Sequence, residues 1–266
     1  MDDAWATVEA LAADAGSGAA EIAREAAGAL TAIQESEVQS AIETLLRGHP
    51  EMAPLWRLGA DVLGAVDPSA GVRAFRERLQ RDRRAVHVLA PALPDRLLTI
   101  SYSSTVTEVV RVRRPASVVC MASEPGGEGV RMAAALSAST EAIVIDDEEA
   151  IASCPADAVV VGADAITPTS LVNKVKTRRI AESAGEHGIV CFGIAGETKL
   201  VPVELPFGSP FEAMALDLFF GIATPAGLLS PPDASKQAAS VGLHPLLLRL
   251  AESMGRAGSL AEDRVP

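Results

Sequence analysis

The spacing of hydrophobic residues changes about a third of the way along the chain. In residues 1–84, apolar side chains recur every three or four positions, as at Ile22, Ala26 and Leu30, which is the spacing of one face of a helix. Five segments follow this pattern, and none of them shows the alternation or the continuous apolar run of a strand. The pattern predicts a helical N-terminal domain, which we place at residues 1–94.

Short apolar runs alternate with helical segments in the rest of the chain. The runs have the length of buried strands, and they lie at residues 96–100, 117–121, 142–145, 158–161 and 189–194. Strands that alternate with helices in this way are typical of a parallel, doubly wound sheet. The predicted fold class is therefore α/β. The helical N-terminal domain is followed by a Rossmann-like domain at residues 95–266, with a mostly parallel sheet and a ligand pocket.

Residues 156–199 form the most informative strand–loop–helix–strand unit of this predicted sheet. An apolar run leads directly into Gly162, Ala163 and Asp164, and a polar turn, a helical segment and a second apolar run follow. Asp164 therefore falls at the carboxyl end of its strand. Ligands bind at that edge in open α/β sheets, so Asp164 is a candidate for the functional site.

Composition and charge limit the partners that we expect. The chain has 266 residues and a formal net charge of −12. An acidic chain has no general electrostatic attraction to nucleic acid or to anionic membranes, so we expect no direct contact with either. No apolar run approaches the ~20 residues of a membrane span. The N-terminal sequence MDDAWATVEA lacks the charge pattern of a signal peptide, so we expect a cytoplasmic protein.

The cysteines and histidines do not have the spacing of a metal site. Cys120 and Cys191 lie inside apolar runs, where a buried and inert thiol is expected, and Cys154 adds no metal-like spacing. The histidines are scattered along the chain, and we expect each of them at the surface or in the core. We therefore predict neither a metal nor a cofactor.

Polar residues follow three of the predicted strands. After the first strand, Ser103 and Ser104 either form an anion site with the backbone N–H groups of the next helix or simply cap that helix. After the second strand, the glycines of residues 123–129 would let a ligand approach the backbone. Their spacing matches no nucleotide-binding fingerprint, so an ordinary loop also explains them.

The third cluster combines Asp164 with Asn173, Lys174 and Lys199. A carboxyl group at a strand end can act as an acid or a base, and asparagine and lysine side chains can hold a phosphate group. A purely structural interpretation is also open. In that case Asp164 caps its own loop, and Lys174 is a solvated helix residue.

These residues belong to a longer set of motifs. GADAI at residues 162–166, NKVKT at 173–177 and GETK at 196–199 resemble the signature of one superfamily. It joins the alpha, beta and delta subunits of translation initiation factor 2B to methylthioribose-1-phosphate isomerase and ribose-1,5-bisphosphate isomerase. The motifs follow the family order over about residues 95–245, and RGHPEMAPL at residues 47–55 is similar to a further family segment. The resemblance implies a helical N-terminal domain, a Rossmann-like C-terminal domain and a homodimer formed through the C-terminal domain.

The resemblance also implies a phosphorylated small molecule as the ligand. The isomerases of this superfamily move a sugar carbonyl group from C1 to C2 without a metal, and they use a cysteine and an aspartate for proton transfer. The aspartate matches Asp164, and the amide and lysine that contact the substrate match Asn173 and Lys174. We expect the ligand to be bound by Ser103, Ser104, Asn173, Lys174 and Lys199.

Two departures fall on residues that the isomerases need. Ser101 stands at the position of the catalytic cysteine, and a serine hydroxyl needs an activating base that the sequence does not reveal. Glu124 stands where the family has a phosphate-binding arginine. The residues that could supply the missing cation are Lys176, Arg178 and Arg179.

Three functions remain open. The first is a divergent initiation-factor-2B-like protein that binds a phosphorylated sugar or nucleotide and lacks the usual isomerase chemistry. The second is an aldose–ketose isomerase of the ribose-1,5-bisphosphate type that uses Asp164. The third is a regulatory subunit of a translation-factor-like assembly. The replaced cysteine and arginine favour the first function, and the sequence alone leaves open whether the protein is an enzyme.

Overall fold

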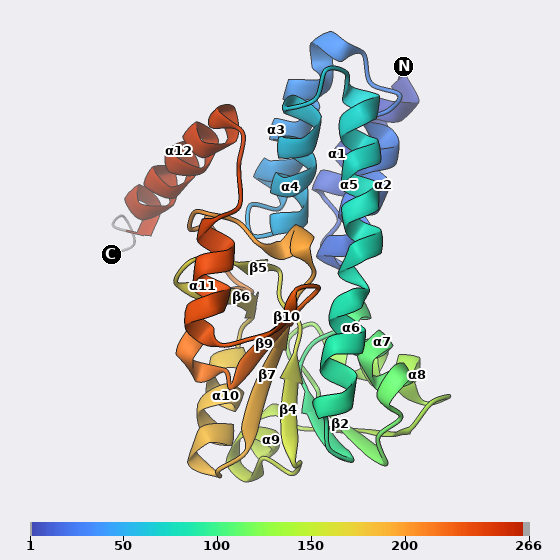
Figure 1. The fold of residues 1–266 in the computed structure, drawn as a ribbon, viewed down its shortest axis with the longest axis vertical. Helices are drawn as coiled ribbons and strands as arrows, with labels where there is room; N and C mark the ends of the chain where they lie inside the picture. The colour runs from blue at the N-terminus through green and yellow to red at the C-terminus, as the bar shows by residue number, and fades with distance from the viewer. Residues whose placement is uncertain (1, 263–266) are drawn as a thin grey trace.

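The computed structural model describes residues 2–262, and a helical part and a sheet part follow one another along its long axis (Figure 1). The helical part is formed by the N-terminal region, as the spacing of its apolar residues predicts. Its helices are α1 (Asp2–Ala12), α2 (Ala19–Ala29), α3 (Val38–Gly48), α4 (Ala53–Leu63) and α5 (Pro68–Asp82), with a 3-10 turn η1 (Glu35–Glu37) before α3.

Local sequence explains where α5 begins and how closely it packs. The Asp67 side chain accepts a hydrogen bond of 2.8 Å from a backbone N–H of the first turn, and Pro68 occupies a position where no N–H is needed. Gly71 lies directly against α4, since a Cβ atom there would come within 2.4 Å of the Asp61 carbonyl oxygen. The absent side chain therefore lets α4 and α5 lie side by side.

The sheet part is built on seven strands in the order β10-β9-β7-β4-β1-β2-β3. All neighbouring pairs are parallel except β9 and β10. The predicted α/β class, with a helical N-terminal region and a mostly parallel sheet, is thus confirmed. The strands are β1 (Arg96–Thr99), β2 (Ser117–Met121), β3 (Glu141–Ile145), β4 (Ala158–Val161), β7 (Val190–Ile194), β9 (Gly221–Thr224) and β10 (Gly227–Leu229).

Helices cover both faces of this sheet because alternate strand residues point to opposite sides. Leu97 belongs to the core under the first group of helices, and Leu98 to the core under the second. The first group is α6 (Arg84–Leu89), α7 (Ser104–Arg113) and α8 (Glu128–Leu136). The second group is α9 (Asp147–Ser153), α10 (Thr177–Glu186) and α11 (Pro231–Ala239).

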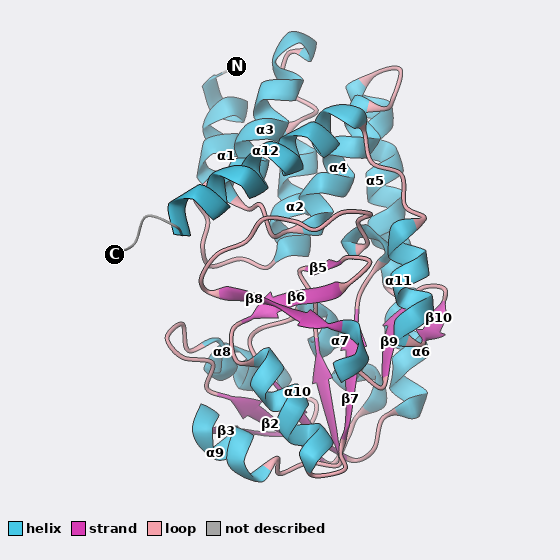
Figure 2. Ribbon diagram, turned by 90° about the vertical axis from the view of Figure 1, so that its left-hand side faces the viewer, coloured by secondary structure: helices cyan, strands magenta, loops and turns pink. Residues whose placement is uncertain are grey.

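A small antiparallel sheet lies between the helical part and the main sheet (Figure 2). It consists of β5 (Ala165–Ile166), β6 (Ser170–Lys174) and β8 (Phe211–Ala215). The sequence predicts a turn followed directly by a helix here, but Asn173 and Lys174 end a strand. Their partners are Glu212 and Phe211, which arrive from far along the chain, so the local pattern could not reveal this pairing.

The last described helix, α12 (Pro245–Glu262), packs against α4. Leu247 of α12 and Val172 of the small sheet belong to the same hydrophobic core as the N-terminal helices. The domain boundary after residue 94 stays a prediction. None of the helices in residues 2–262 combines the length and the hydropathy needed to cross a lipid bilayer.

Candidate functional site

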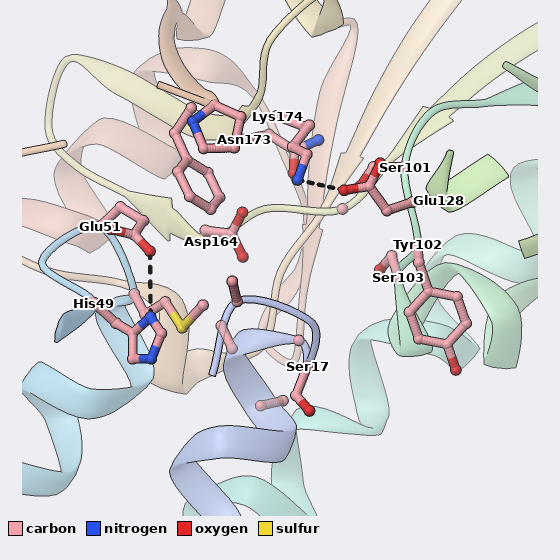
Figure 3. Close-up of a pocket in the computed structure, with 18 of the residues that line it drawn as sticks. Ser17, His49, Glu51, Ser101, Tyr102, Ser103, Glu128, Asp164, Asn173 and Lys174 are labelled. Atoms are coloured by element: carbon pink, nitrogen blue, oxygen red, sulfur yellow. Dashed lines mark ion pairs between the residues drawn. The ribbon is translucent and has the colours of Figure 1, made fainter. Parts of the chain in front are cut away.

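A cavity of about 300 Å³ lies where the helical part, the main sheet and the small sheet meet (Figure 3). Its walls come from segments that are far apart in the sequence, at residues 14–20, 48–52, 101–104, 162–164 and 208–211. The structure brings the expected catalytic position and all expected ligand-binding residues to this wall: Ser101, Ser103, Ser104, Asp164, Asn173, Lys174 and Lys199. Whether they bind a ligand stays a prediction.

Asp164 lies in the middle of the cavity, between β4 and β5 (Figure 3). Its backbone N–H donates to the carbonyl oxygen of Val172 at 2.8 Å, and its own carbonyl oxygen accepts from the N–H of Ala53 at 3.0 Å. These bonds fix the residue to both the small sheet and the start of α4. No hydrogen bond to its carboxyl group comes from the residues that the structure describes. The carboxyl oxygens are therefore free for a ligand.

Charges around Asp164 oppose one another. Burial raises the pKa of its carboxyl group, and this effect outweighs the neighbouring Lys199 ammonium, which favours the charged form. Glu51 raises the pKa further, and Lys174 opposes the rise. A carboxyl group with a raised pKa can exchange a proton with a ligand closer to neutral pH than an ordinary aspartate can.

Lys199 lies beneath the Asp164 loop and is buried. It ends the 3-10 turn η3 (Glu197–Lys199), and its Nζ donates a hydrogen bond to the carbonyl oxygen of Ala163. Burial lowers the pKa of its ammonium group, although Asp164 and Asp82 favour the charged form. This residue holds the loop in place as well as lining the cavity.

The side chains at the end of β6 have protein partners. Lys174 forms an ion pair with Glu128 of α8, and its Nζ lies 5.6 Å from the ring centroid of Phe211. Asn173 donates from Nδ2 to the Thr177 hydroxyl at 3.2 Å. The second carboxylate oxygen of Glu128, Oε2, is buried and has no hydrogen-bond partner among the described residues. Glu128 therefore pairs with Lys174 through one oxygen, while its other oxygen is enclosed by the protein.

The serines after β1 have different tasks. Ser103 caps α7, because its hydroxyl accepts a hydrogen bond of 3.3 Å from the Val106 N–H. The capping interpretation therefore holds for Ser103. Ser101 has a φ of 63° in the left-handed region, and its N–H donates to the Ser123 hydroxyl at 2.7 Å. Its own hydroxyl has no hydrogen bond within the described chain, so the activating base that a nucleophilic or acidic serine needs is missing.

The loop after β2 is fixed by Asp147 of α9. Its carboxylate accepts hydrogen bonds from the N–H groups of Ser123 at 2.7 Å and Glu124 at 3.0 Å, and from Lys176 at 2.5 Å. Burial alone would raise the pKa of Asp147, but Lys176 and the two N–H groups bring it below its usual value. Glu124 itself does not line the cavity.

The basic residues that the sequence offered as substitutes for the family arginine all have other partners. Lys176 pairs with Asp147, and Arg179 pairs with Glu148 at 2.7 Å. Arg178 donates to the carbonyl oxygen of Ala213. None of these cations lines the cavity, so within the described residues they do not replace the arginine.

Arg131 of α8 is the cation that sequence reasoning missed. It lines the cavity, its guanidinium carbon lies 3.8 Å from the ring centroid of Tyr102, and it donates to the carbonyl oxygen of Gly16 at 2.8 Å. Gly16 lies in the loop before α2, so Arg131 connects the helical part to the sheet part. No local pattern marks this residue, because its partner is 115 positions away in the sequence.

His49 and Glu51 form a second group that the sequence did not single out. His49 follows α3, and one ring nitrogen lies 2.7 Å from the carbonyl oxygen of Leu11 and the other 3.8 Å from a Glu51 carboxylate oxygen. Burial lowers the pKa of the imidazole, but Glu51 and the Leu11 carbonyl raise it by more. Both side chains border the cavity. The one available signal was the segment RGHPEMAPL, which contains both residues.

The N-termini of two helices also reach the cavity. Gly18, Ala19 and Ala20 of the α2 start and Ser104 of the α7 start belong to its wall. No side chain caps the first turn of α2. Helix N-termini present N–H groups and a partial positive charge, so this wall favours an anionic group.

Comparisons with known proteins identify the family of the chain through one family model and its fold through solved structures. A family model described as the Initiation factor 2 subunit family matches residues 69–210. No curated protein matches the sequence. Among solved structures, the translation initiation factor eIF-2B of Pyrococcus horikoshii OT3 is similar, with a TM-score of 0.77 and 24% sequence identity. That match covers 88% of this chain and 98% of the other.

Other solved structures of the same fold come from an assembly and from an enzyme. The tetrameric eIF2B-beta2-delta2 complex of C. thermophilum contains a chain with a TM-score of 0.73 and 16% identity, covering 88% of this chain and 93% of that one. The 5-methylthioribose 1-phosphate isomerase of Pyrococcus horikoshii OT3 has a TM-score of 0.68 and 21% identity, covering 90% and 88%. At these identities the structures establish the fold.

Proposed function

Because the chain belongs to the initiation factor 2 subunit family, we propose that its cavity binds a phosphorylated sugar or nucleotide without the usual isomerase chemistry. The observation that carries this proposal is the free carboxyl group of Asp164, which lies in the cavity without a hydrogen-bond partner from the described residues. This carboxyl group offers acceptors for the hydroxyl groups of a sugar.

The opposite wall suits the phosphate group of such a ligand. The loop before α2, which carries Ser17, faces Asp164 across the cavity (Figure 3). This loop leads into the uncapped N-terminus of α2, and the α7 start and Arg131 border the same cavity. Helix N-termini and a guanidinium group bind phosphate through N–H donors and positive charge. The ligand would thus place its phosphate at α2 and its hydroxyl groups at Asp164.

The absence of isomerase chemistry follows from Ser101. An aldose–ketose conversion needs one group that removes a proton and another that delivers it. Asp164 can serve as one of them, but the Ser101 hydroxyl has no base within hydrogen-bonding distance among the described residues. Asp164 would therefore hold and orient the ligand.

Binding can be tested by calorimetry and thermal shift with ribose 1,5-bisphosphate, methylthioribose 1-phosphate and nucleoside monophosphates. A ligand at a hundredfold excess over its Kd should stabilise the protein by about 2.7 kcal/mol. Asp164→Asn should weaken that binding about tenfold or more, since it removes a charged acceptor. Asp217→Asn is the matched control, because Asp217 is exposed and lies outside the cavity.

Two results would contradict this proposal. If none of these compounds shifts the unfolding temperature, the cavity does not bind this class of ligand. If a compound is converted to its ketose and Asp164→Asn abolishes the conversion, the protein is an isomerase. A bound ligand that remains unchanged supports the proposal.

We further propose that the protein acts in the cytoplasm as a homodimer formed through its sheet part. β3 is the edge strand of the main sheet, and its Ile143 and Val144 are exposed, as is Val130 of the adjacent α8. Apolar side chains beside an open sheet edge favour association with a second chain. Light scattering should give the mass of a dimer for the wild type and of a monomer for Ile143→Lys. A monomeric wild type would contradict the dimer.

A further inference from the structure

A second cavity lies on the flank of the molecule, next to the first. It is a groove of about 920 Å³ between α2, α5, α6 and α7. Figure 1 shows α2 beside α5, and α7 beside α6, on one side of the molecule. The groove meets the first cavity at Ala20, Ser104 and Lys199, which line both. It is large enough for a ligand of nucleotide size.

The groove is basic, although the chain as a whole carries a net charge of −12. Its lining includes the two carboxylates Asp82 and Glu108. Glu108 is paired with Arg83 at 3.2 Å, and Asp82 accepts a hydrogen bond from Thr198. The cationic side chains are more numerous: Arg24, Arg76, Arg83, Arg111 and Lys199. Positive charge is therefore concentrated in the groove, although the molecule as a whole is negatively charged.

Two of these arginines are free to bind a ligand. Arg24 of α2 and Arg76 of α5 are exposed, and neither makes an ion pair or a hydrogen bond with any residue that the structure describes. They belong to different helices, which lie side by side (Figure 1). Arginine forms paired hydrogen bonds with phosphate oxygens, and two free guanidinium groups can hold more than one phosphate.

Apolar side chains supply another part of the lining. Leu79 of α5, Val86 of α6 and Val112 of α7 border the groove, and Val112 is 45% exposed. The groove thus combines cations with an apolar surface on which a flat ring can lie. The hydroxyl groups of Ser104 and Thr105 provide further donors at the start of α7. Phosphate-binding cations next to an apolar surface match the chemistry of a nucleotide.

We propose that this groove binds a nucleotide with two or more phosphate groups. Arg24 and Arg76 hold the phosphates, and the base lies against Leu79 and Val112. Asp164 does not line the groove. The proposal therefore does not depend on what the first cavity binds.

The test is isothermal titration calorimetry of the full chain with ADP, inorganic pyrophosphate and adenosine at about physiological ionic strength. ADP is expected to bind at one site per chain, pyrophosphate at least tenfold more weakly, and adenosine not measurably. The double variant Arg24→Gln/Arg76→Gln should weaken ADP binding at least tenfold. The matched control is Arg73→Gln/Arg84→Gln, which changes the net charge equally through exposed arginines outside the groove. This control should bind ADP like the wild type.

Several results would overturn the proposal. The first is that ADP does not bind, and the second is that Arg24→Gln/Arg76→Gln binds ADP as well as the wild type does. The third is that the control variant loses as much ADP affinity as Arg24→Gln/Arg76→Gln. The fourth is that ADP and pyrophosphate bind with equal affinity. The last result would show an anion site without recognition of the nucleoside. Asp164→Asn separates the two proposals, because it should impair the first cavity and leave ADP binding unchanged. Circular dichroism of each variant shows whether it has folded.

Discussion

At the scale of single residues, the unpartnered groups in the cavity are the features that most need explanation. Buried polar atoms in folded proteins almost always have hydrogen-bond partners. Glu128 has an oxygen without one among the described residues, and Asp164 faces the cavity without one. Leaving such groups unpaired costs free energy. Ligand binding would supply the missing partner of Asp164.

Asp164→Asn should therefore stabilise the free protein while it weakens ligand binding. The folded protein raises the pKa of Asp164 above its ordinary value of 3.8. The protonated form is thus favoured on folding, and this contribution is lost as the pH rises through the raised pKa. The neutral asparagine avoids that loss, so the variant should be more stable at neutral pH by about 1 kcal/mol. Urea unfolding should show this advantage at about pH 7 and little of it near pH 4. An equal difference at both pH values would contradict the argument.

His49 should make the stability of the protein depend on pH in a higher pH range than Asp164 does. Its pKa is raised above 6.5, so its contribution to stability is complete below that value and is lost as the pH rises through the raised pKa. Losing the charged hydrogen bond to the Leu11 carbonyl should cost about 1 kcal/mol. The free energy of unfolding of the wild type, measured against His49→Gln, should fall as the pH rises from 6.5 through the raised pKa. Glu51→Gln should reduce this slope, and a flat difference would show that the contacts do not favour the imidazolium.

At the scale of elements, α9 fixes the loop that supports Ser101. Asp147 near its start binds the loop after β2 through two N–H groups, and the hydroxyl of Ser123 in that loop accepts from Ser101. Two strand ends of the main sheet are thereby connected through one carboxylate. This connection explains why Ser101 can keep a φ of 63°.

Replacing Asp147 should cost more than its position on a short helix suggests. Asp147→Asn weakens its hydrogen bonds to the N–H groups of the loop and leaves Lys176 without its charged partner, so we expect a loss of about 2–3 kcal/mol in the free energy of unfolding. Glu148→Gln on the same helix is the control and should have little effect, because its pair with Arg179 is exposed. Urea unfolding at neutral pH measures both. Equal losses in the two variants would mean that the buried hydrogen bonds of Asp147 contribute no more to stability than the exposed ion pair of Glu148.

The helices and strands around the site also explain which of its residues could be predicted from the sequence. Asp164 was identified because a continuous apolar run ends three residues before it, which is a local signal. The strand character of Asn173 and Lys174 was missed because their pairing partner β8 begins only at Phe211. Arg131 and His49 were missed for the same reason, since their contacts reach Gly16 and Leu11. Most motifs that marked the family lie within the sheet part, and in the helical part only RGHPEMAPL pointed to the wall, whose remaining residues there, 14–20, carried no motif.

At the scale of the whole molecule, the contact between the helical and sheet parts is charged as well as hydrophobic. Arg78 of α5 bonds to Asp61 of α4 at 3.0 Å and also pairs with Glu197 of η3. Arg81 adds a bond to Glu197 at 3.3 Å. Burial raises the pKa of Glu197, but these arginines bring it below its usual value. A network of partly buried charges therefore links α4 and α5 to the turn that carries Lys199.

Arg78→Gln should weaken this connection and the stability of the whole chain. Hydrogen bonds to charged groups contribute about 2 kcal/mol, so a loss of this size is expected in urea unfolding. Arg73→Gln on the same helix is the control, because Arg73 is exposed and outside this network, and it should change stability by less than about 0.5 kcal/mol. Unfolding in two separate transitions would contradict the idea that the two parts are stabilised together.

The shared wall of the cavity has a consequence for the motions of the chain. Residues 14–20 and 48–52 belong to one part of the molecule, and residues 101–104 and 162–164 to the other. A ligand that forms hydrogen bonds to both parts would hold them together and suppress motions that separate the helical part from the sheet part. Amide hydrogen exchange should then slow at both segments at once when a ligand is added, including the start of α2, which is about 140 residues from Asp164. Slower exchange in only one of the two parts would show that the ligand does not connect them.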